Sequence, residues 1–258
     1  MAMWSRNRKA AGILALSPVA EAYVRNVNER VEASGSPYRP DPFWVRAHGS
    51  AIELDEGPHA VVEMALTWPN DVDTVSWVVT HERIYVAVYD HRKSLVSGYT
   101  VALHKLVSCY TNCEMLTVAG PGAFFILGDV GGTAIAAEAS DRLCALIEAA
   151  ALPHSDPPLA CIAAYSVAFA RGLHPIVEEK FATVTAHADR LSVQGEAGES
   201  SISADDVVSI TAEGGVLHID AGEQQLVGST DLPESIPAHV LTTCLATGRP
   251  FGKIVSHG

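Results

Sequence analysis

The sequence predicts an α+β protein built from two similar units, each a series of short antiparallel strands followed by one helix. Two observations lead to this prediction. Residues 77–152 alternate apolar and polar side chains between turn residues and then continue with an amphipathic helical pattern. A later part of the chain repeats this order. The matched segments are residues 79–86 with 186–193, 101–108 with 202–209, 114–118 with 215–219, and 126–128 with 226–228.

The composition limits the kinds of partner that the protein can have. The chain has 258 residues, of which 48% are hydrophobic, as is typical of globular proteins. It carries 30 acidic against 17 basic residues, a net charge of -13, which makes nucleic acids and anionic membranes unfavourable partners. No apolar run reaches the roughly 18 residues that a membrane span needs. We therefore expect a protein partner, for which a basic surface would be complementary, and no nucleic acid or membrane span.

The cysteines and the N-terminus bear on the cellular compartment. Five cysteines, an odd number scattered along the chain, do not suggest a disulfide framework, so we expect a reducing, cytoplasmic setting. Residues 1–16 have a basic start and a short apolar run, as secretory signals do, but Ser17 and Pro18 start a new element directly afterwards. We expect a solvated, frayed N-terminus here, and a signal peptide is the alternative.

The first predicted element is an N-terminal helix. Ser17 can cap it, Pro18 suits its first turn, and apolar residues then recur every four positions. These apolar residues are Val19, Tyr23, Val27 and Val31. Three prolines between residues 37 and 42 indicate an arm, which delivers the aromatic pair Phe43 and Trp44 to the first core. Residues 1–52 are thus predicted to be a helix and a proline-rich arm.

Unit one is predicted to span residues 53–153. Its apolar alternation and its turn residues indicate seven strands and a closing helix. The predicted strands are residues 61–67, 74–80, 83–89, 99–103, 106–111, 114–118 and 123–127. The helix that follows places Ala139, Leu143, Leu146, Ile147 and Ala150 on one apolar face.

A linker and unit two complete the chain. Residues 154–175 are predicted to be a linker, in which residues 159–172 form a connecting helix that is apolar nearly all round and is buried between the units. Unit two spans residues 176–258, with its first strands between 176 and 193 and a tight hairpin turn at Gly214 and Gly215. Its later strands are residues 200–203, 206–211, 216–220 and 224–227. Because of Pro237, the closing helix should start near Ile236, and it should end near Gly248.

The repeated segments carry a resemblance to a known fold. The step Thr80-His81-Glu82-Arg83-Ile84 and the segment 101–108, together with Arg190-Leu191 and the segment 202–209, are similar to core positions of bacterial pleckstrin-homology-like and GRAM-like domains. The resemblance implies a tandem of two half-open β-barrels, each closed by a C-terminal helix, together with the N-terminal and connecting helices. It also implies a binding or scaffolding role, with a partner docked at an edge strand or between strand five and the closing helix.

Two groups of residues are candidate binding sites. In unit one, the candidate contacts to a protein partner are Lys105, Ser108 and Tyr110, with Arg142 on the helix. The candidate ligand-binding residues are His91, Arg92 and Lys93, which form the only dense basic cluster after the N-terminus. In lipid-binding relatives, a basic loop between early strands binds phosphoinositides, but this cluster lies one hairpin later in the chain. Lipid binding is therefore a secondary expectation.

Other function classes have weaker support. Residues 127–137 resemble the phosphate loop of sugar kinases of the actin-like superfamily, so phosphoryl transfer at residues 128–133 is an alternative. However, about 125 residues follow this loop, which is too few for the second lobe of such an enzyme. An acidic inhibitor or immunity-type protein that covers a basic partner is a third possibility. We expect a protein without enzymatic activity.

A metal site or a cofactor is not expected either. Cys109 and Cys113 could bind a metal together with His81 or His104, but no second pair of ligands at zinc spacing follows them. The eleven histidines are dispersed, with no His-x-x-x-His pair and no Gly-x-Ser-x-Gly turn. The sequence therefore predicts neither a metal ligand set nor a catalytic residue.

Overall fold

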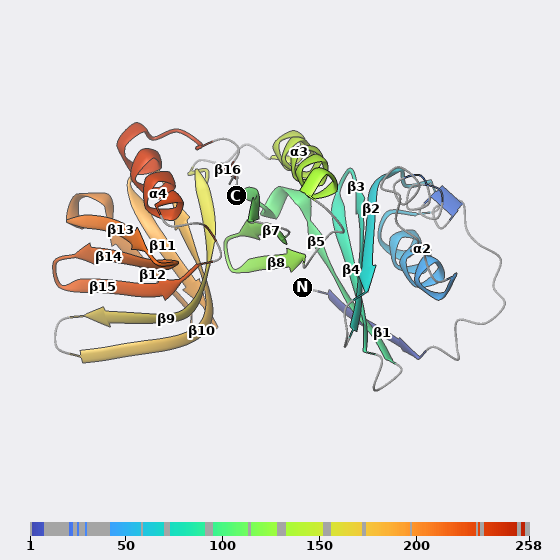
Figure 1. Cartoon of the computed structure of the whole chain (residues 1–258), viewed down its shortest axis with the longest axis horizontal. Helices are drawn as coiled ribbons and strands as arrows, with labels where there is room; N and C mark the ends of the chain where they lie inside the picture. Colours follow the sequence, from blue (N-terminus) through green and yellow to red (C-terminus); the bar gives the residue numbers. More distant parts are fainter. Residues whose placement is uncertain are drawn as a thin grey trace. The chain divides into compact units, whose positions relative to one another are not determined.

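The structure is a computed structural model and shows two compact units (Figure 1). One unit comprises Met1–His104 with Leu127–Ala139, and the other comprises Lys105–Ile126 with Ser140–Gly258. This grouping cuts across the predicted units 53–153 and 176–258. The residues that the structure describes are 2–7, 21–22, 25, 29, 42–57, 59–69, 73–90, 95–112, 115–127, 133–151, 156–171, 174–196, 198–230, 232, 235–251 and 254–255.

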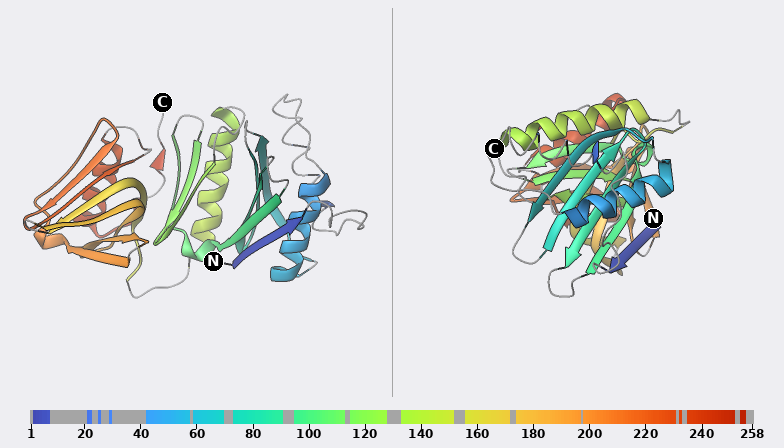
Figure 2. Two further views of the ribbon diagram at one scale, coloured as in Figure 1. Left: turned by 90° about the horizontal axis from the view of Figure 1, so that it is seen from below. Right: turned by 90° about the vertical axis from the view of Figure 1, so that its right-hand side faces the viewer.

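The first compact unit contains a five-stranded antiparallel sheet in the order β1-β5-β4-β3-β2. Its strands are β1 (Ala2–Asn7), β2 (Val62–Pro69), β3 (Asp73–Thr80), β4 (Arg83–Asp90) and β5 (Leu95–Ala102). Helix α2 (Pro42–Glu56) lies against one face of this sheet (Figure 2). Trp77, Ile84 and Tyr85 of this sheet are fully buried, and α2 contributes the fully buried Ile52 and His48.

The N-terminal part of this unit differs from the prediction. Residues 2–7 are not frayed, because β1 pairs with β5 along its whole length. Of the predicted helix from Ser17, only residues 21, 22, 25 and 29 are described, and these are helical. Phe43 and Trp44 belong to the first turn of α2, which the sequence analysis missed. Gly49 and Ser50 of α2 have weak helix propensity, and the prolines before the helix indicate an arm and not a helix.

The second compact unit contains a seven-stranded antiparallel sheet in the order β12-β11-β10-β9-β15-β14-β13. Its strands are β9 (Ala160–Arg171), β10 (His174–Ala186), β11 (Arg190–Gly195), β12 (Gly198–Ser203), β13 (Ser209–Glu213), β14 (Val216–Ala221) and β15 (Gln224–Ser229). Helix α4 (Ile236–Thr247) follows, and Gly248 ends it in the left-handed conformation with φ of 60°. Both predicted ends of this helix are confirmed.

The predicted connecting helix at residues 159–172 is wrong, because this segment is strand β9. Cys161, Ile162, Ala163 and Ala164 are completely buried, although their side chains alternate between the two faces of the sheet. A strand covered on both faces is apolar without interruption, as a buried helix is. The alanines added a helical preference, and the pairing with β10 overrode it.

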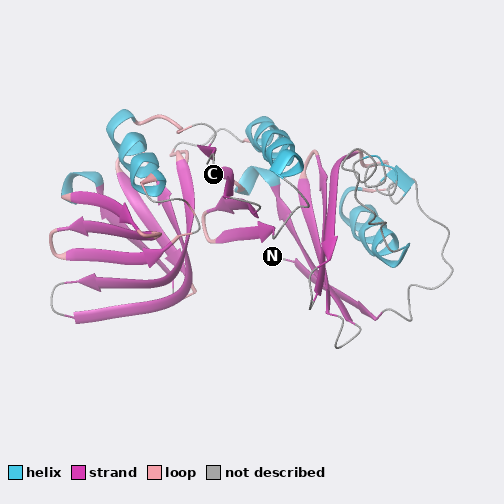
Figure 3. Cartoon of the chain, viewed as in Figure 1, coloured by secondary structure: helices cyan, strands magenta, loops and turns pink. Residues whose placement is uncertain are grey.

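A smaller sheet also belongs to the second compact unit. It has the order β16-β6-β7-β8 and is formed by β6 (Ser108–Asn112), β7 (Met115–Gly120), β8 (Ala123–Leu127) and β16 (Ile254–Val255). Helix α3 (Thr133–Ala150) follows β8 and buries Leu143 and Ile147, two residues of the predicted apolar face. Across the described residues, strands predominate over a few helices, so the α+β class is confirmed (Figure 3). Within the described part of the chain, none of the three sheets closes into a barrel.

The same order of elements occurs twice. The first series is β2 to β8 followed by α3, and the second is β9 to β15 followed by α4. Strands β6, β7 and β8 begin 101 residues before β13, β14 and β15, respectively. The short 3-10 helices η2 (Leu103–Lys105) and η3 (Ala204–Asp206) are separated by the same 101 residues.

Backbone hydrogen bonds repeat with the elements. The N–H of Leu103 donates to the carbonyl of Glu82 over 2.7 Å, and the N–H of Ala204 donates to that of Asp189 over 2.8 Å. Just after η2, the N–H of Val107 donates to the carbonyl of Ala119 over 2.9 Å. The counterpart of this last bond runs from Val208 to Asp220 over 2.7 Å. The two series differ in their sheets, because β9 joins β15 in the second series, whereas β2 and β8 lie in separate sheets in the first.

Candidate functional site

Two of the four predicted partner contacts are buried inside the second compact unit. Ser108 and Tyr110 on β6 are 8% and 0% exposed. The Ser108 hydroxyl accepts a hydrogen bond from the N–H of Cys161 over 2.8 Å, and the Tyr110 hydroxyl accepts one from Ala163 over 3.3 Å. Their role is therefore internal, since they satisfy amides of β9 before its pairing with β15 begins at Tyr165. Two residues apart on one strand, these side chains share a face, but the sequence does not reveal what covers that face.

The turn between β7 and β8 adds another hydrogen bond to the seven-stranded sheet. The N–H of Gly122 donates to the Thr183 hydroxyl on β10 over 2.9 Å. At Gly120, a Cβ atom would lie 2.0 Å from the carbonyl oxygen of Lys105, so only glycine fits. The small sheet is thus held to the large one by polar side chains, whereas the close backbone packing at Gly120 joins β7 to the segment that precedes β6.

The remaining predicted site residues are placed as follows. Lys105 is exposed at the end of η2, and Arg142 is exposed on α3, so both stay predicted surface contacts. His91, Arg92 and Lys93 lie outside the described residues. The same holds for residues 128–132 of the loop that resembles a phosphate loop, and only its Thr133 is described, as the first residue of α3.

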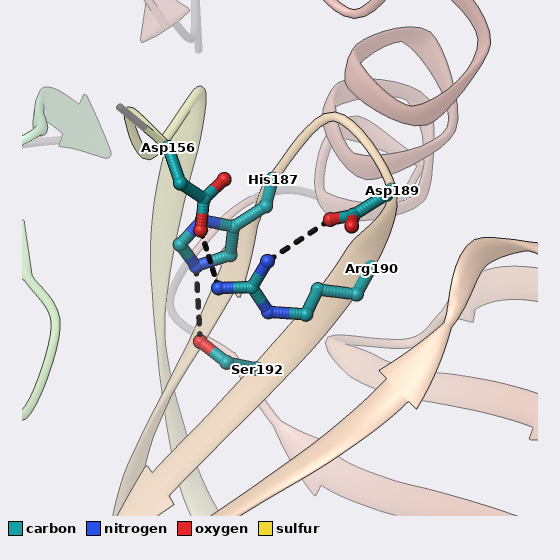
Figure 4. Close-up of polar contacts among 5 residues, drawn as sticks. All are labelled: Asp156, His187, Asp189, Arg190 and Ser192. Atoms are coloured by element: carbon teal, nitrogen blue, oxygen red, sulfur yellow. Dashed lines mark hydrogen bonds and ion pairs between the residues drawn. The ribbon is translucent and has the colours of Figure 1, made fainter. Parts of the chain in front are cut away.

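A polar cluster that the sequence analysis did not anticipate lies at the start of the large sheet (Figure 4). The Asp156 carboxylate contacts the guanidinium of Arg190 at 2.5 Å and Nδ1 of His187 at 3.3 Å. Nε2 of His187 lies 3.3 Å from the Ser192 hydroxyl, and Arg190 also contacts Asp189 at 2.9 Å. The Arg190 guanidinium, followed by the nearby imidazole, holds the pKa of Asp156 below its usual value.

The order carboxylate, imidazole, hydroxyl in this cluster is that of a serine hydrolase, but the surroundings do not suit catalysis. Ser192 is 3% exposed within strand β11, so its oxygen cannot meet a substrate. The Asp156 oxygen that faces the imidazole is shared with Arg190. The cluster instead ties residues just before β9 to the hairpin between β10 and β11. Asp156 is 34 positions from Arg190, and sequence pattern carries no signal for such a pair.

The corresponding hairpin in the first compact unit uses other partners. The Thr80 hydroxyl accepts hydrogen bonds from the N–H groups of Glu82 and Arg83, over 3.2 and 3.1 Å. It donates to Glu56 of α2 over 2.6 Å, and the Tyr85 hydroxyl donates to the same carboxylate oxygen over 2.9 Å. Burial and the neighbouring Glu56 carboxylate raise the pKa of Tyr85, so this phenol stays a donor.

A small hollow opens on the large sheet. Its volume is about 100 Å³, and it is lined by the apolar side chains of Val167, Phe169 and Val193 and by the carboxylates of Glu179 and Glu199. Glu179 already accepts a hydrogen bond from the N–H of Glu196 over 3.1 Å. The hollow has the size of a few water molecules, so it does not accommodate a cofactor.

The outer edges of two equivalent strands, β6 and β13, differ in whether another strand occupies them. Strand β16 pairs in parallel with β6, with Ile254 opposite Tyr110 and Val255 opposite Thr111. Strand β13 is the counterpart of β6 in the second series, and among the described residues no strand pairs with its outer side. A sheet edge of this kind can take an added strand.

The hairpin turn fixes which backbone groups of β13 face outward. Gly214 and Gly215 have φ of 59° and 76°, the positive values that a type I′ turn needs at both central positions and that glycine adopts without strain. In such a hairpin the residues flanking the loop are a hydrogen-bonded pair, and this alternates along the strands. The amides and carbonyls of Ile210 and Ala212 therefore point away from β14. Val208, just before β13, is 71% exposed.

The described part of the chain shows neither a metal ligand set nor a helix that could span a membrane. It contains no group of three or more His, Cys, Asp or Glu side chains placed to hold a metal ion. None of its helices combines the length and the apolar character needed to cross a membrane.

Comparisons with known proteins do not identify a family. No protein-family profile matches the chain, and no curated protein matches it. Among solved structures, the chain is similar to a DnaN sliding clamp (DNA polymerase III subunit beta) from Pseudomonas aeruginosa, solved with griselimycin bound. The identity is 10%, the match covers 88% of this chain and 64% of the clamp chain, and the TM-score is 0.12. A likeness at that level supports no argument about fold or function.

Proposed function

We propose that this chain is a cytoplasmic, non-enzymatic protein that binds a protein partner and is built from tandem pleckstrin-homology-like units. The second series supports the fold part of the proposal. Its first four strands lie in the order β12-β11-β10-β9, the last three join at β15, and helix α4 follows. The first series repeats the elements, although its last three strands lie in a separate sheet.

The observation that carries the binding role is the outer edge of β13. Outward backbone groups at Ile210 and Ala212 lie next to an exposed apolar side chain, Val208, and α4 packs beside this strand. Unpaired amides and carbonyls give affinity for an extended segment, and neighbouring side chains give specificity. A bare edge of this kind is otherwise a risk of aggregation, so a partner that covers it would also protect the protein.

The charge of the chain defines the partner further. A net charge of -13 attracts basic proteins and repels anionic ones, and salt weakens both effects. The exposed Lys105 and Arg142 of the first series are local exceptions and remain predicted contacts. An acidic inhibitor that covers a basic partner is a special case of this proposal.

The test is affinity purification from the native host followed by mass spectrometry, with three versions of the chain. The first is the wild type. The second is Ala212→Pro, which removes an outward N–H of β13 without breaking its pairing with β14. The third is the matched control Ser201→Pro, which removes an outward N–H on the opposite edge, β12, where the two-residue loop after Gly195 sets the same alternation.

The expected result is one stoichiometric protein that the wild type and Ser201→Pro retain and that Ala212→Pro loses. Circular dichroism of each variant checks that the fold is intact. If no protein is retained at stoichiometric level by the wild type, or if Ala212→Pro retains it fully, the proposal for the β13 edge fails.

A further inference from the structure

We propose that the edge of β13 binds a basic, extended segment of the partner, and that this segment runs parallel to β13. The inference rests on the proposed function and adds the direction, the register and the charge of the bound segment. It comes from comparing two equivalent edges within one chain, of which one is occupied and the other is open.

The occupied edge gives the direction and the register. Strand β16 runs parallel to β6, with Ile254 opposite Tyr110 and Val255 opposite Thr111. Strands β6 and β13 begin 101 residues apart; β13 ends its sheet order, and β6 is followed there only by β16. A segment bound to β13 in the same way would place two residues opposite Thr211 and Ala212. The β-branched pair on β16 is the type of residue that suits such a position, beside the exposed Val208.

The two edges differ in the charge at their N-terminal ends. Strand β6 is preceded by His104 and Lys105, and the counterparts before β13 are Asp205 and Asp206; all four are exposed. In a parallel arrangement, the residues on the N-terminal side of the bound segment lie toward this end. A cationic side chain there would face two carboxylates on the β13 edge.

The difference in charge matters because the two edges select their occupants differently. At β6 the occupant belongs to the same chain, so its local concentration is high and little selectivity is needed. At β13 the occupant comes from another molecule, and its side chains must distinguish it from competing segments. The carboxylates of Asp205 and Asp206 favour a cation, and they disfavour the acidic segments that most of this chain's own surface would offer.

A peptide experiment tests direction and position together. The probe is an acetylated peptide with the sequence of residues 252–258, Gly-Lys-Ile-Val-Ser-His-Gly, which carries one cation before the β-branched pair. The protein is the full, isotope-labelled chain. We expect saturable NMR shifts at the amides of residues 208–213. A second form of this peptide, with a nitroxide-bearing group in place of the N-terminal acetyl, should broaden the amides near Asp206. Broadening near Gly214 would mean an antiparallel strand and would overturn the assignment.

A charge exchange tests the chemistry of recognition. Replacing Asp205 and Asp206 by lysine should weaken binding of the lysine peptide about fivefold, the size expected for two exposed charge pairs. A second peptide with glutamate in place of its lysine should bind the wild type about fivefold more weakly and should recover on the doubly substituted protein. If both peptides bind both proteins equally, charge does not select the segment and the inference fails.

Two further outcomes separate this inference from the proposed function. If no peptide shifts β13 but the native partner is still lost in Ala212→Pro, a partner of different chemistry uses the edge and only the inference fails. If the wild type alone forms dimers in sedimentation experiments, and Val255→Pro abolishes them, the occupant is the C-terminal segment of a second copy, and the basic-partner inference is overturned. If neither peptide nor partner depends on β13, both proposals fail.

Discussion

The hairpin between β3 and β4 and the hairpin between β10 and β11 occupy equivalent places in the two series. They share a backbone hydrogen bond but differ in their side-chain partners. Both carbonyls, of Glu82 and of Asp189, accept a hydrogen bond from the first residue of a 3-10 helix. In the first hairpin Thr80 reaches Glu56 of α2, and in the second Arg190 reaches Asp156 before β9. The backbone bonds belong to the repeat, whereas the side chains serve whichever segment lies beside each hairpin.

The same contrast holds for the strands that follow. In the first series β6 uses Ser108 and Tyr110 to bind amides of β9, and its outer edge carries β16. Its counterpart β13 has the exposed Thr211 at the position of Tyr110, and no strand of the described residues pairs with its outer edge. One strand of the repeat is therefore used for internal assembly, and the other is the edge at which we propose that a partner binds. The predictions below test this division, from the largest expected effect to the smallest.

Gly120→Ala should have the largest effect. The added Cβ would meet the carbonyl oxygen of Lys105 at 2.0 Å, so we expect a loss of about 3 kcal/mol or more in the stability of the second compact unit. The counterpart of Gly120 is Ala221, which is 6% exposed and accommodates its methyl group. The reverse change, Ala221→Gly, should cost only about 1 kcal/mol.

Hydrogen exchange can measure these losses of stability in the second compact unit itself. All four tryptophans of the chain, at positions 4, 44, 68 and 77, lie in the first compact unit, so fluorescence does not report on the second. Exchange of the β9 amides does. Equal effects of the two substitutions would show that β7 and β14 are packed alike and would remove this part of the comparison.

Tyr110→Phe should come next. It removes the hydroxyl that accepts from Ala163 and leaves that N–H buried, which costs about 2 kcal/mol. At the counterpart position, Thr211→Ala changes an exposed side chain and should stay within about 0.5 kcal/mol of the wild type. The free energy of unfolding is measured in urea, with hydrogen exchange at the Ala163 amide as the reporter. A loss at Thr211 as large as that at Tyr110 would contradict the division between internal and open strands.

Acid should weaken the first compact unit through His48. This side chain is completely buried in α2, and burial lowers its pKa from 6.5 to about 3. Because the unfolded chain takes up the proton first, stability is constant above pH 6.5 and falls as the pH drops from 6.5 toward 3. The slope from this residue is about 1.4 kcal/mol per pH unit. Tryptophan fluorescence in urea, measured at several pH values, should show a smaller slope for His48→Leu, and an unchanged slope would contradict the assignment.

The polar cluster around Asp156 should contribute less. Its carboxylate is 40% exposed, so solvent screens the pair with Arg190, and Asp156→Asn should cost about 0.5 kcal/mol. Because its folded pKa is lowered, this contribution is present at neutral pH and is lost as the pH falls through the folded pKa. The matched control is Asp189→Asn, whose side chain is 76% exposed and should have no measurable effect. Exchange at the Leu159 amide, which donates to Ala186, reports the result.

The last prediction is that the protein does not bind nucleotides. The first series joins its last strand to its helix through the glycine-rich residues 128–132, and the second uses residues 230–235, which contain no glycine. If the glycines serve only as a connection, titration calorimetry with Mg-ATP should show no heat of binding. Micromolar affinity that disappears in Asp129→Ala would instead favour the phosphoryl-transfer alternative.

The sequence predicted the local elements better than their assembly. Strand β14 alternates buried apolar and more exposed polar residues, and the turn glycines and Pro237 mark ends that the structure confirms. Strand β9 failed because burial on both faces removes the alternation. The two-residue strand β16 has no pattern at all.

The candidate sites were harder to predict for a physical reason. Whether Tyr110 faces solvent or β9 depends on a segment 53 residues later in the chain, and local pattern does not encode such a distance. From the sequence alone, the acidic pair Asp205 and Asp206 indicates only a solvated turn. Its importance for β13 becomes visible once η3 is matched to η2, whose residues at those positions are His104 and Lys105.

The pairing of β16 with β6 has a consequence for protein synthesis. Residues 108–112 leave the ribosome long before residues 254–255, and at about 5–20 residues per second the delay is on the order of ten seconds. During that time the outer edge of β6 is bare on the nascent chain. The β9 amides that Ser108 and Tyr110 bind are also made later than β6. During synthesis, the first series therefore has exposed strand edges for longer than the second. We expect a ribosome-associated chaperone to act on the first series more than on the second.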